Sequence, residues 1–214
     1  MAIDKHINFF ELEKACQEEG CPLCRIVTDR TWRYLDNMLF EHISDRPFRA
    51  AHRSAGGFCR EHSKNLSSFR DGLAVAILGR DILEDRIESF KKNKAWKPKA
   101  LCPVCAEQQR IENEYLSFLA ETRGQSPEEL ELQKKFTASE GLCAPHYEAL
   151  LRLSKKIPLW LKQFQEQKFE KLLERVNRFI DLSAYGKQDQ FAALSESDQV
   201  VWKELARTLR GTIQ

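Results

Sequence analysis

The chain has 214 residues, 42% of them hydrophobic, which is enough to bury a core as one large domain or two small ones. Its 34 basic and 32 acidic residues leave a net charge of +2, which gives no reason to expect a dedicated nucleic-acid or anionic-membrane protein. Because the sequence contains neither an apolar run long enough to span a bilayer nor the apolar segment of a secretory signal, we predict a cytoplasmic protein without a membrane span.

The hydrophobic pattern is helical along the chain, and alternating strand patterns are nearly absent. Apolar residues recur at three- and four-residue spacings over 25–43, 59–92 and 105–122. The middle segment is predicted to be one long helix. Its apolar stripe comprises Leu66, Phe69, Leu73, Ile77, Leu83, Ile87 and Phe90. The basic stretch 91–99, KKNKAWKPK, is expected to be a linker or loop after this helix.

Helix signals continue to the C-terminus. Ser126 followed by Pro127 and two glutamates is typical of a helix start, since serine caps and acids favour the positive end of the helix dipole. A further long helix is predicted over about 158–182. The last helix is expected to begin near residue 195 or 197 and to stop at Gly211. The predicted fold class is therefore all-α, a helical bundle.

Six of the seven cysteines fall into two matching sets, each a CPxC motif followed by a CxxH motif. The sets are Cys21, Cys24, Cys59 and His62, and Cys102, Cys105, Cys143 and His146. The hexamer GFCREH at 57–62 recurs as GLCAPH at 141–146, which indicates an internal duplication. We predict two metal-binding helical repeats over 1–95 and 96–182 and a helical tail over 183–214, which could pack as one domain.

The residue types in these motifs are those of a metal site. Two ligands three positions apart at a helix start can reach one ion, and proline suits the first helical turn. The positive helix end favours the thiolate form of cysteine. Three thiolates and one imidazole make the closed ligand set of a structural zinc site. We therefore predict that the eight residues bind two Zn²⁺ ions.

Several alternatives stay open at this stage. The same ligands could hold iron–sulfur clusters, in which case the chain would be an electron-transfer or redox-sensing protein. A metal-free redox role for CPxC would need a βαβ frame, and disulfides are not expected in a reducing compartment. Pairing of the motifs within each repeat is the economical arrangement. A crossed pairing, with CPxC of one repeat facing CxxH of the other, is physically possible and would fuse the halves into one unit.

Residues outside the two sets carry weaker signals. Cys16 is expected to be a buried free thiol, and His6, His42 and His52 are expected at the surface or at helix ends. Motifs of catalytic sites are absent from the sequence, so an enzyme is not favoured. The favoured function is a zinc-stabilised protein-interaction or regulatory module with a protein partner. Nucleic-acid binding through KKNKAWKPK and Lys155–Lys156 is the less favoured alternative.

The order of these motifs resembles an uncharacterised prokaryotic family that is known as a domain of unknown function. The duplicated CPxC and CxxH motifs carry the resemblance. The tail is also similar: a helix that ends near Arg175–Phe179, then an Asp-x-x-x-Trp element from Asp198 to Trp202, then a closing Leu-x-Gly. The resemblance covers most of the chain. It implies this helical architecture and these cysteine and histidine ligands, but it implies no reaction.

Overall fold

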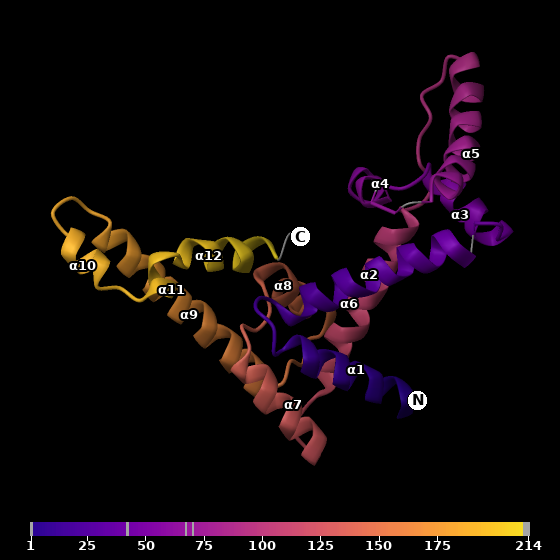
Figure 1. Cartoon of the computed structure of the whole chain (residues 1–214). Coiled ribbons are helices and arrows are strands. Elements are labelled where there is room, and N and C mark those ends of the chain that lie inside the picture. Colours follow the sequence, from indigo (N-terminus) through magenta and orange to yellow (C-terminus); the bar gives the residue numbers. More distant parts are fainter. Residues whose placement is uncertain (1, 42, 67, 70, 212–214) are drawn as a thin grey trace. The chain divides into compact units, whose positions relative to one another are not determined.

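The fold is all-α, as predicted. The computed structural model describes residues 2–41, 43–66, 68–69 and 71–211, with side chains from residue 7 onward. In these residues the chain forms twelve helices and no strand (Figure 1). None of these described helices combines the length and the apolar composition that a membrane span requires. The relation between the two halves as repeats stays a prediction.

The chain divides into two compact units. Unit 1 comprises Met1–Ile26 and Glu112–Gln214, and unit 2 comprises Val27–Ile111. Two helices, α2 (Pro22–Glu41) and α6 (Pro103–Glu121), have residues in both units. The segments 1–95, 96–182 and 183–214 were defined by duplication along the sequence, and their role as domains stays a prediction.

Unit 1 contains the first helix and the whole C-terminal part of the chain. In it α1 packs against α7, and the last helix, α12, packs against α8 and α9. The short helices α10 and α11 also pack against α9. The helices are α1 (Ala2–Ala15), α7 (Pro127–Ala138), α8 (Ala144–Leu153), α9 (Leu159–Leu182), α10 (Gln188–Ala192), α11 (Glu196–Gln199) and α12 (Val201–Arg210).

Local signals in unit 1 explain where its helices begin and end. The Ser126 side chain accepts a hydrogen bond from the backbone N–H of Glu129, which confirms the predicted start of α7. The expected last helix is divided, because the chain leaves helical geometry at Val200 between α11 and α12. Gly211 follows α12 with φ of 82° and ends it as predicted. The Arg175 guanidinium ties α9 to this tail by bonding both Asp198 and Glu204.

Unit 2 holds α3 (Arg46–Ala55), α4 (Arg60–Leu66) and α5 (Gly72–Lys91), and the prediction of one helix over 59–92 is wrong. Helix α4 ends at Leu66. The Asp71 side chain then accepts a hydrogen bond from the Ala74 N–H and caps the start of a separate helix, α5. The basic stretch after α5 is non-helical from residue 92 onward, as expected.

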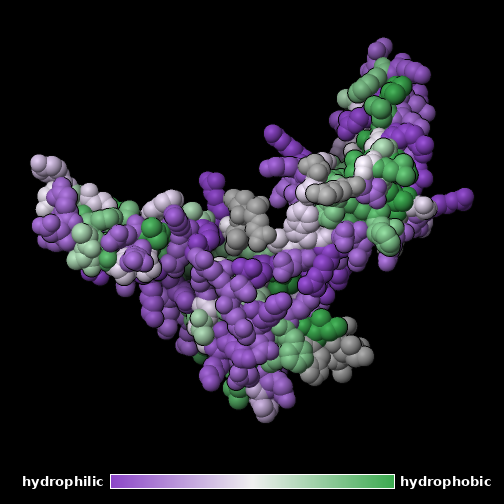
Figure 2. Space-filling view, viewed as in Figure 1, coloured by the Kyte–Doolittle hydropathy of each residue, from purple (hydrophilic) through white to green (hydrophobic). Residues whose placement is uncertain are grey.

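The apolar stripe predicted for this segment is not a core stripe on α5. Leu73, Leu83 and Phe90 are 73%, 57% and 60% exposed, whereas α5 buries Ala74, Leu78 and Asp81. Figure 2 shows hydrophobic residues gathered over α5. The hydrophobic spacing was therefore a correct sign of a helix and a wrong guide to its buried face.

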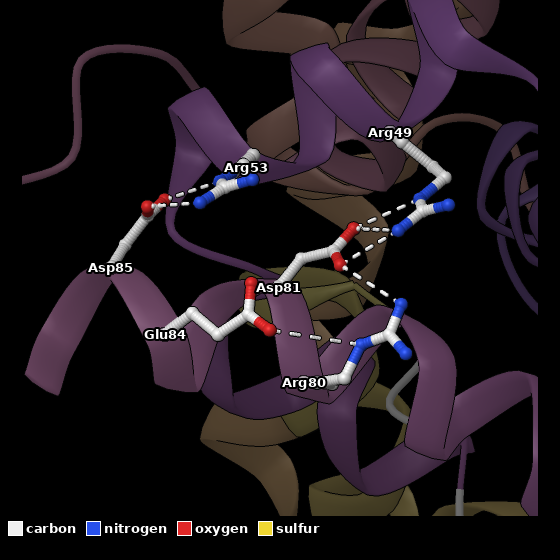
Figure 3. Close-up of polar contacts among 6 residues, drawn as sticks. All are labelled: Arg49, Arg53, Arg80, Asp81, Glu84 and Asp85. Carbon is white, nitrogen blue, oxygen red and sulfur yellow. Dashed lines mark hydrogen bonds and ion pairs between the residues drawn. The ribbon is translucent and has the colours of Figure 1, made fainter.

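Two ion pairs fasten α3 to α5, one helical turn apart (Figure 3). The Arg49 guanidinium donates to both carboxylate oxygens of Asp81 at 2.6–2.8 Å, and Arg53 donates to both oxygens of Asp85 at 2.5 and 2.8 Å. Asp81 is only 5% exposed. Because a buried carboxylate needs a partner, the Arg49 pair fixes how α3 lies on α5.

His52 on α3 corrects a second expectation. It lies in the last turn of α3, at a helix end as expected, but it is 3% exposed rather than at the surface, and its ring lies against Phe48 and Phe58. Burial lowers the pKa of His52, although the nearby Asp81 carboxylate raises it. The imidazole therefore packs as a neutral aromatic group. His42 and the side chain of His6 lie outside the described residues.

Replacement of Arg49 by alanine should destabilise unit 2 by about 2 kcal/mol, because it leaves a buried carboxylate with only Arg80 nearby. That guanidinium lies 3.8 Å from Asp81, beyond hydrogen-bonding distance. Arg53→Ala is the matched control, since the Arg53 side chain is 44% exposed, and its loss should change stability by less than about 1 kcal/mol. Urea unfolding followed by circular dichroism measures both. Equal effects would contradict a special role for Asp81.

Candidate metal centres

The eight predicted ligands converge in two clusters, each of three cysteines and one histidine. Group A comprises Cys21, Cys24, Cys143 and His146, and group B comprises Cys59, His62, Cys102 and Cys105. In each group the sulfur and ring-nitrogen atoms all lie within 4.8 Å of one another. Group A lies wholly within unit 1 and group B wholly within unit 2.

Group A is built around the Nδ1 atom of His146. This nitrogen lies 3.4, 3.5 and 3.1 Å from the sulfurs of Cys21, Cys24 and Cys143. The sulfurs of Cys24 and Cys143 are 3.6 Å apart. All four side chains are buried, so water has little access to the space that they enclose.

Group B repeats this geometry with different segments. The Nδ1 atom of His62 lies 3.2, 3.6 and 3.4 Å from the sulfurs of Cys59, Cys102 and Cys105. The sulfurs of Cys59 and Cys105 are 3.7 Å apart. In this group Cys59 and Cys105 are half-buried, whereas Cys102 and His62 are buried.

The pairing of the motifs is crossed. CPxC of the first set meets CxxH of the second in group A, and CxxH of the first set meets CPxC of the second in group B. Pairing within each repeat, which looked economical from the sequence, is wrong. The crossing also does not merge the chain into one unit: each of the two units holds one complete group.

Four helix starts supply the ligands in the same way. In each motif the first cysteine directly precedes a helix, namely α2, α8, α4 or α6, and the second ligand lies in its first turn. The spacing of three residues therefore turns both side chains toward one point. The positive helix ends favour negative charge on the sulfurs. This local arrangement is what the sequence motifs predicted.

A buried amide holds the loop that brings Cys143 into group A. Gln165 is fully buried on α9, and its side chain accepts from the N–H of Leu142 at 2.9 Å and donates to the carbonyl of Leu142 at 2.8 Å. Gly141, just before, has φ of 74°, a conformation that favours glycine. The backbone just before Cys143 is thus held in place by the Gln165 side chain.

Two further contacts close group A. The Nε2 atom of His146 faces a carboxylate oxygen of Glu112 at 3.7 Å, so the ring is oriented from behind. Gly211, at the end of α12, lies so close that an added Cβ would be 3.2 Å from the Cys24 sulfur and 3.7 Å from the Cys143 sulfur. A bare backbone therefore covers this group, and the C-terminal tail is part of its wall.

Group B lacks these supports. The Nε2 atom of His62 is buried and has no hydrogen-bond partner among the described residues. Its loop is held by short-range bonds instead, from the Ser63 hydroxyl to the carbonyl of Phe58 at 3.2 Å and from the Gly57 N–H to the carbonyl of His52 at 2.9 Å. Together with the half-buried Cys59 and Cys105, these features make group B the more open of the two.

Because the sulfurs lie close together, the pKa values of the cysteines shift in opposite directions. Contacts with Cys143 and Cys21 hold the pKa of Cys24 far below its usual range, whereas burial raises that of Cys21 well above it. Burial alone would lower the pKa of His146, but its contacts with Cys143, Cys24 and Glu112 raise it to about 11. In group B, burial and the neighbouring sulfurs raise the pKa of Cys105 to about 12. These shifts pair a Cys24 thiolate with a protonated His146, so a metal that binds through His146 must displace the imidazole proton.

Cys16 belongs to neither group. It is a buried free thiol, as predicted, and burial raises its pKa to about 12, opposed by a hydrogen bond with Ser139. The sequence analysis missed Glu112, Gln165 and Gly211 as supports of group A. Gly211 did stand out as a helix stop, but no local signal connects Glu112 or Gln165 to residues so distant in sequence.

Comparisons with known proteins agree with the predicted resemblance. Residues 5–101 match the model of a family of unknown function, DUF6062. The chain is also 25% identical over 176 residues to an uncharacterized 23.9 kDa protein in the xynA 3′ region of Caldicellulosiruptor sp. (strain Rt8B.4), covering 79% of this chain and 85% of that protein. No solved structure matches the chain. The resemblance to an uncharacterised family is confirmed, and it brings no activity with it.

The crossed pairing predicts which cysteines, far apart in the sequence, form disulfides when a chelator removes metal and a mild oxidant is added. Cys24 should link to Cys143, and Cys59 to Cys105, because their sulfurs are 3.6 and 3.7 Å apart. Peptide mapping of the denatured product by mass spectrometry identifies the links. Disulfides between Cys24 and Cys59 or between Cys105 and Cys143 would contradict the observed pairing, and Cys16 should stay free.

Proposed function

We propose that this chain is a zinc protein in which groups A and B each bind one Zn²⁺ through three thiolates and the Nδ1 atom of a histidine. In this proposal the ions stabilise two helical units of a cytoplasmic protein-interaction or regulatory module. The spacing of the ligand atoms within each group is the observation that carries it.

The spacing fits a tetrahedron around one ion. With zinc–sulfur and zinc–nitrogen bonds of about 2.3 and 2.05 Å, a regular tetrahedron places two sulfurs about 3.8 Å apart and sulfur and nitrogen about 3.6 Å apart. The Cys24–Cys143 sulfurs of group A are 3.6 Å apart and the Cys59–Cys105 sulfurs of group B 3.7 Å, and the sulfur–nitrogen distances are 3.1–3.6 Å. One ion of zinc's size therefore fits between the four atoms.

An iron–sulfur cluster fits this spacing less well. A cluster distributes its protein ligands over several irons that are joined by inorganic sulfide, so the outer ligands stand farther apart than around one ion. All four ligand atoms of each group lie within 4.8 Å of one another. This compactness favours a single ion and supports zinc over the cluster alternative.

The closed ligand sets favour a structural role for the ions. A catalytic zinc keeps a position open for water or substrate, whereas each of these groups offers four protein ligands. Binding to such a site supplies apparent folding free energies of about 10–16 kcal/mol, which is comparable with the total stability of a domain. The function is therefore assigned to the helical surfaces that the ions hold together.

Metal analysis of the purified protein tests the proposal. Protein prepared both aerobically and anaerobically should be colourless and contain two zinc ions and no inorganic sulfide per chain. Cys16→Ser is the control and should retain both ions, because Cys16 lies outside both groups. A brown protein that contains iron and sulfide would contradict the zinc assignment.

Double substitutions add a test of which ligands share an ion. Cys21→Ser with Cys143→Ser should remove one zinc, since both residues belong to group A. Cys21→Ser with Cys59→Ser should remove two. Native mass spectrometry counts the ions, and the reverse result would indicate pairing within repeats.

The two ions should differ in lability. Since group B has two half-buried cysteines and an unpartnered His62 Nε2, its zinc should be released to a chelator at least about tenfold faster than that of group A. A colorimetric chelator follows the release, and alkylation of the released thiols shows their origin. Cys59 and Cys105 should be alkylated first in the unaltered protein. Simultaneous alkylation of both groups would contradict this inequivalence.

A further inference from the structure

Unit 2 contains an apolar groove that neither metal group uses. It has a volume of about 640 Å³ and lies between α5 on one side and α4 with the end of α3 on the other. Its lining is mainly aliphatic and aromatic and includes Phe58, Leu66, Phe69, Val75, Ile82 and Leu83. Sites for small molecules have volumes of about 300–1,000 Å³ and this kind of apolar lining.

Two glycines leave open space between the side chains on the α5 side of the groove. Gly72 and Gly79 both line it, and a Cβ added at either would meet nothing within 4 Å. Gly79 lies within α5, where glycine is less favourable than alanine by about 1 kcal/mol. No close packing requires glycine there, so the residue preserves open space at a cost in helix stability.

One cation faces this apolar space. Arg86 lines the groove, and none of the other lining residues is acidic. Three arginines of α3 and α5 are occupied by carboxylates, as Figure 3 shows: Arg49, Arg53 and Arg80. Arg86 has no carboxylate partner among the described residues, and it lies 5.1 Å from the ring centre of Trp96. This contact positions the guanidinium and leaves its positive charge uncompensated.

The remaining polar groups of the lining are neutral or occupied. His52 is neutral because burial lowers its pKa. The Ser63 hydroxyl donates to the carbonyl of Phe58. Among the residues that the structure describes, the lining therefore presents apolar walls and one positive charge, at the lining residue nearest to the C-terminal end of α5.

We propose that this groove binds a fatty carboxylate, with the acyl chain along α5 and the carboxylate at Arg86. The lining runs from Gly72 to Arg86, which at 1.5 Å per residue is about 21 Å of helix, a span that accommodates a medium or long acyl chain. A guanidinium binds a carboxylate through two parallel hydrogen bonds. This site is independent of the zinc assignment, because no metal ligand lines the groove.

Isothermal titration of the full, metal-loaded chain with dodecanoate, below its micelle concentration, tests the proposal. Dodecanoate should bind at one site per chain, and dodecanol should bind at least about tenfold more weakly because it lacks the charge. Arg86→Gln should weaken dodecanoate binding by about tenfold and leave dodecanol binding unchanged. Arg80→Gln on the same helix is the matched control and should change neither affinity by more than about twofold.

Gly79→Leu should abolish binding by filling the groove. Since leucine has the higher helix propensity and its Cβ meets no neighbour, this variant should melt at the same temperature as the unaltered chain or higher. Loss of binding with an intact fold and unchanged metal content therefore shows that the groove is the binding site. Absence of dodecanoate binding, equal affinity for dodecanol, or unaltered binding by Gly79→Leu would overturn the proposal. Binding of an acidic amphipathic peptide but not of dodecanoate would overturn it too, in favour of a protein occupant.

Discussion

The fold depends on the convergence of helix starts that are far apart in the sequence. Group A brings together Cys24 and Cys143, which are 119 positions apart, whereas pairing within the first repeat would have joined Cys24 and Cys59 over 35 positions. Loop-closure entropy grows only with the logarithm of loop length, so this longer closure costs about 1 kcal/mol more. A metal ion supplies about ten times that amount. Chain length therefore does not decide the pairing, and the packing of the helices that carry the ligands does.

The same set of four ligands, three cysteines and one histidine, is held more firmly in unit 1 than in unit 2. In group A the ligands are buried among α2, α8 and the glycine that ends α12, and Gln165 fixes the adjoining loop. In group B the core around the ligands is made by residues such as Leu66 and Val104, but two of the cysteines are only half-buried. A duplicated motif has thus been placed in two different settings. The two groups have the same ligands and so the same coordination chemistry. They differ in solvent access because the residues around them differ.

Local chemistry made much of this protein predictable. The all-α class followed from hydrophobic period, the start of α7 from Ser126 and Pro127, and the gathering of cysteine and histidine from their three-residue spacing. These features depend on residues within one or two turns of each other. The pairing of motifs and the supports Glu112 and Gln165 depend on tertiary packing, which leaves no local trace in one sequence.

The errors on helices have separate causes. The periodicity over 59–92 carried through the break before Asp71, because the break contains too few residues to disturb a long window. Helix α3 was not predicted, although Asp45 and Pro47 start it and Gly56 ends it in left-handed geometry. Period also cannot tell which apolar face is buried. On α5 the face that the sequence marks as apolar is largely exposed, and the buried face carries Asp81, which Arg49 neutralises.

Helix α5 is where local preference and the observed structure disagree most. It combines a glycine inside the helix, exposed large apolar side chains and an arginine without a carboxylate partner among the described residues. Sequences that fold well are consistent at every level, and departures from local rules concentrate where function imposes them. Of these residues Gly79, Leu83 and Arg86 line one groove, which gives them a single explanation, whereas the exposed Leu73 and Phe90 lie outside its lining.

The groove and group B also share a short segment of chain. Phe58 and Ser63 line the groove, and Cys59 and His62 between them belong to group B. A ligand in the groove would pack against the same loop that an ion in group B would order. If binding of one occupant strengthens binding of the other, the effect is reciprocal, and the coupling free energy is the same in both directions. The more open metal group is thus the one whose occupancy a groove ligand can influence, whereas group A belongs to the other unit.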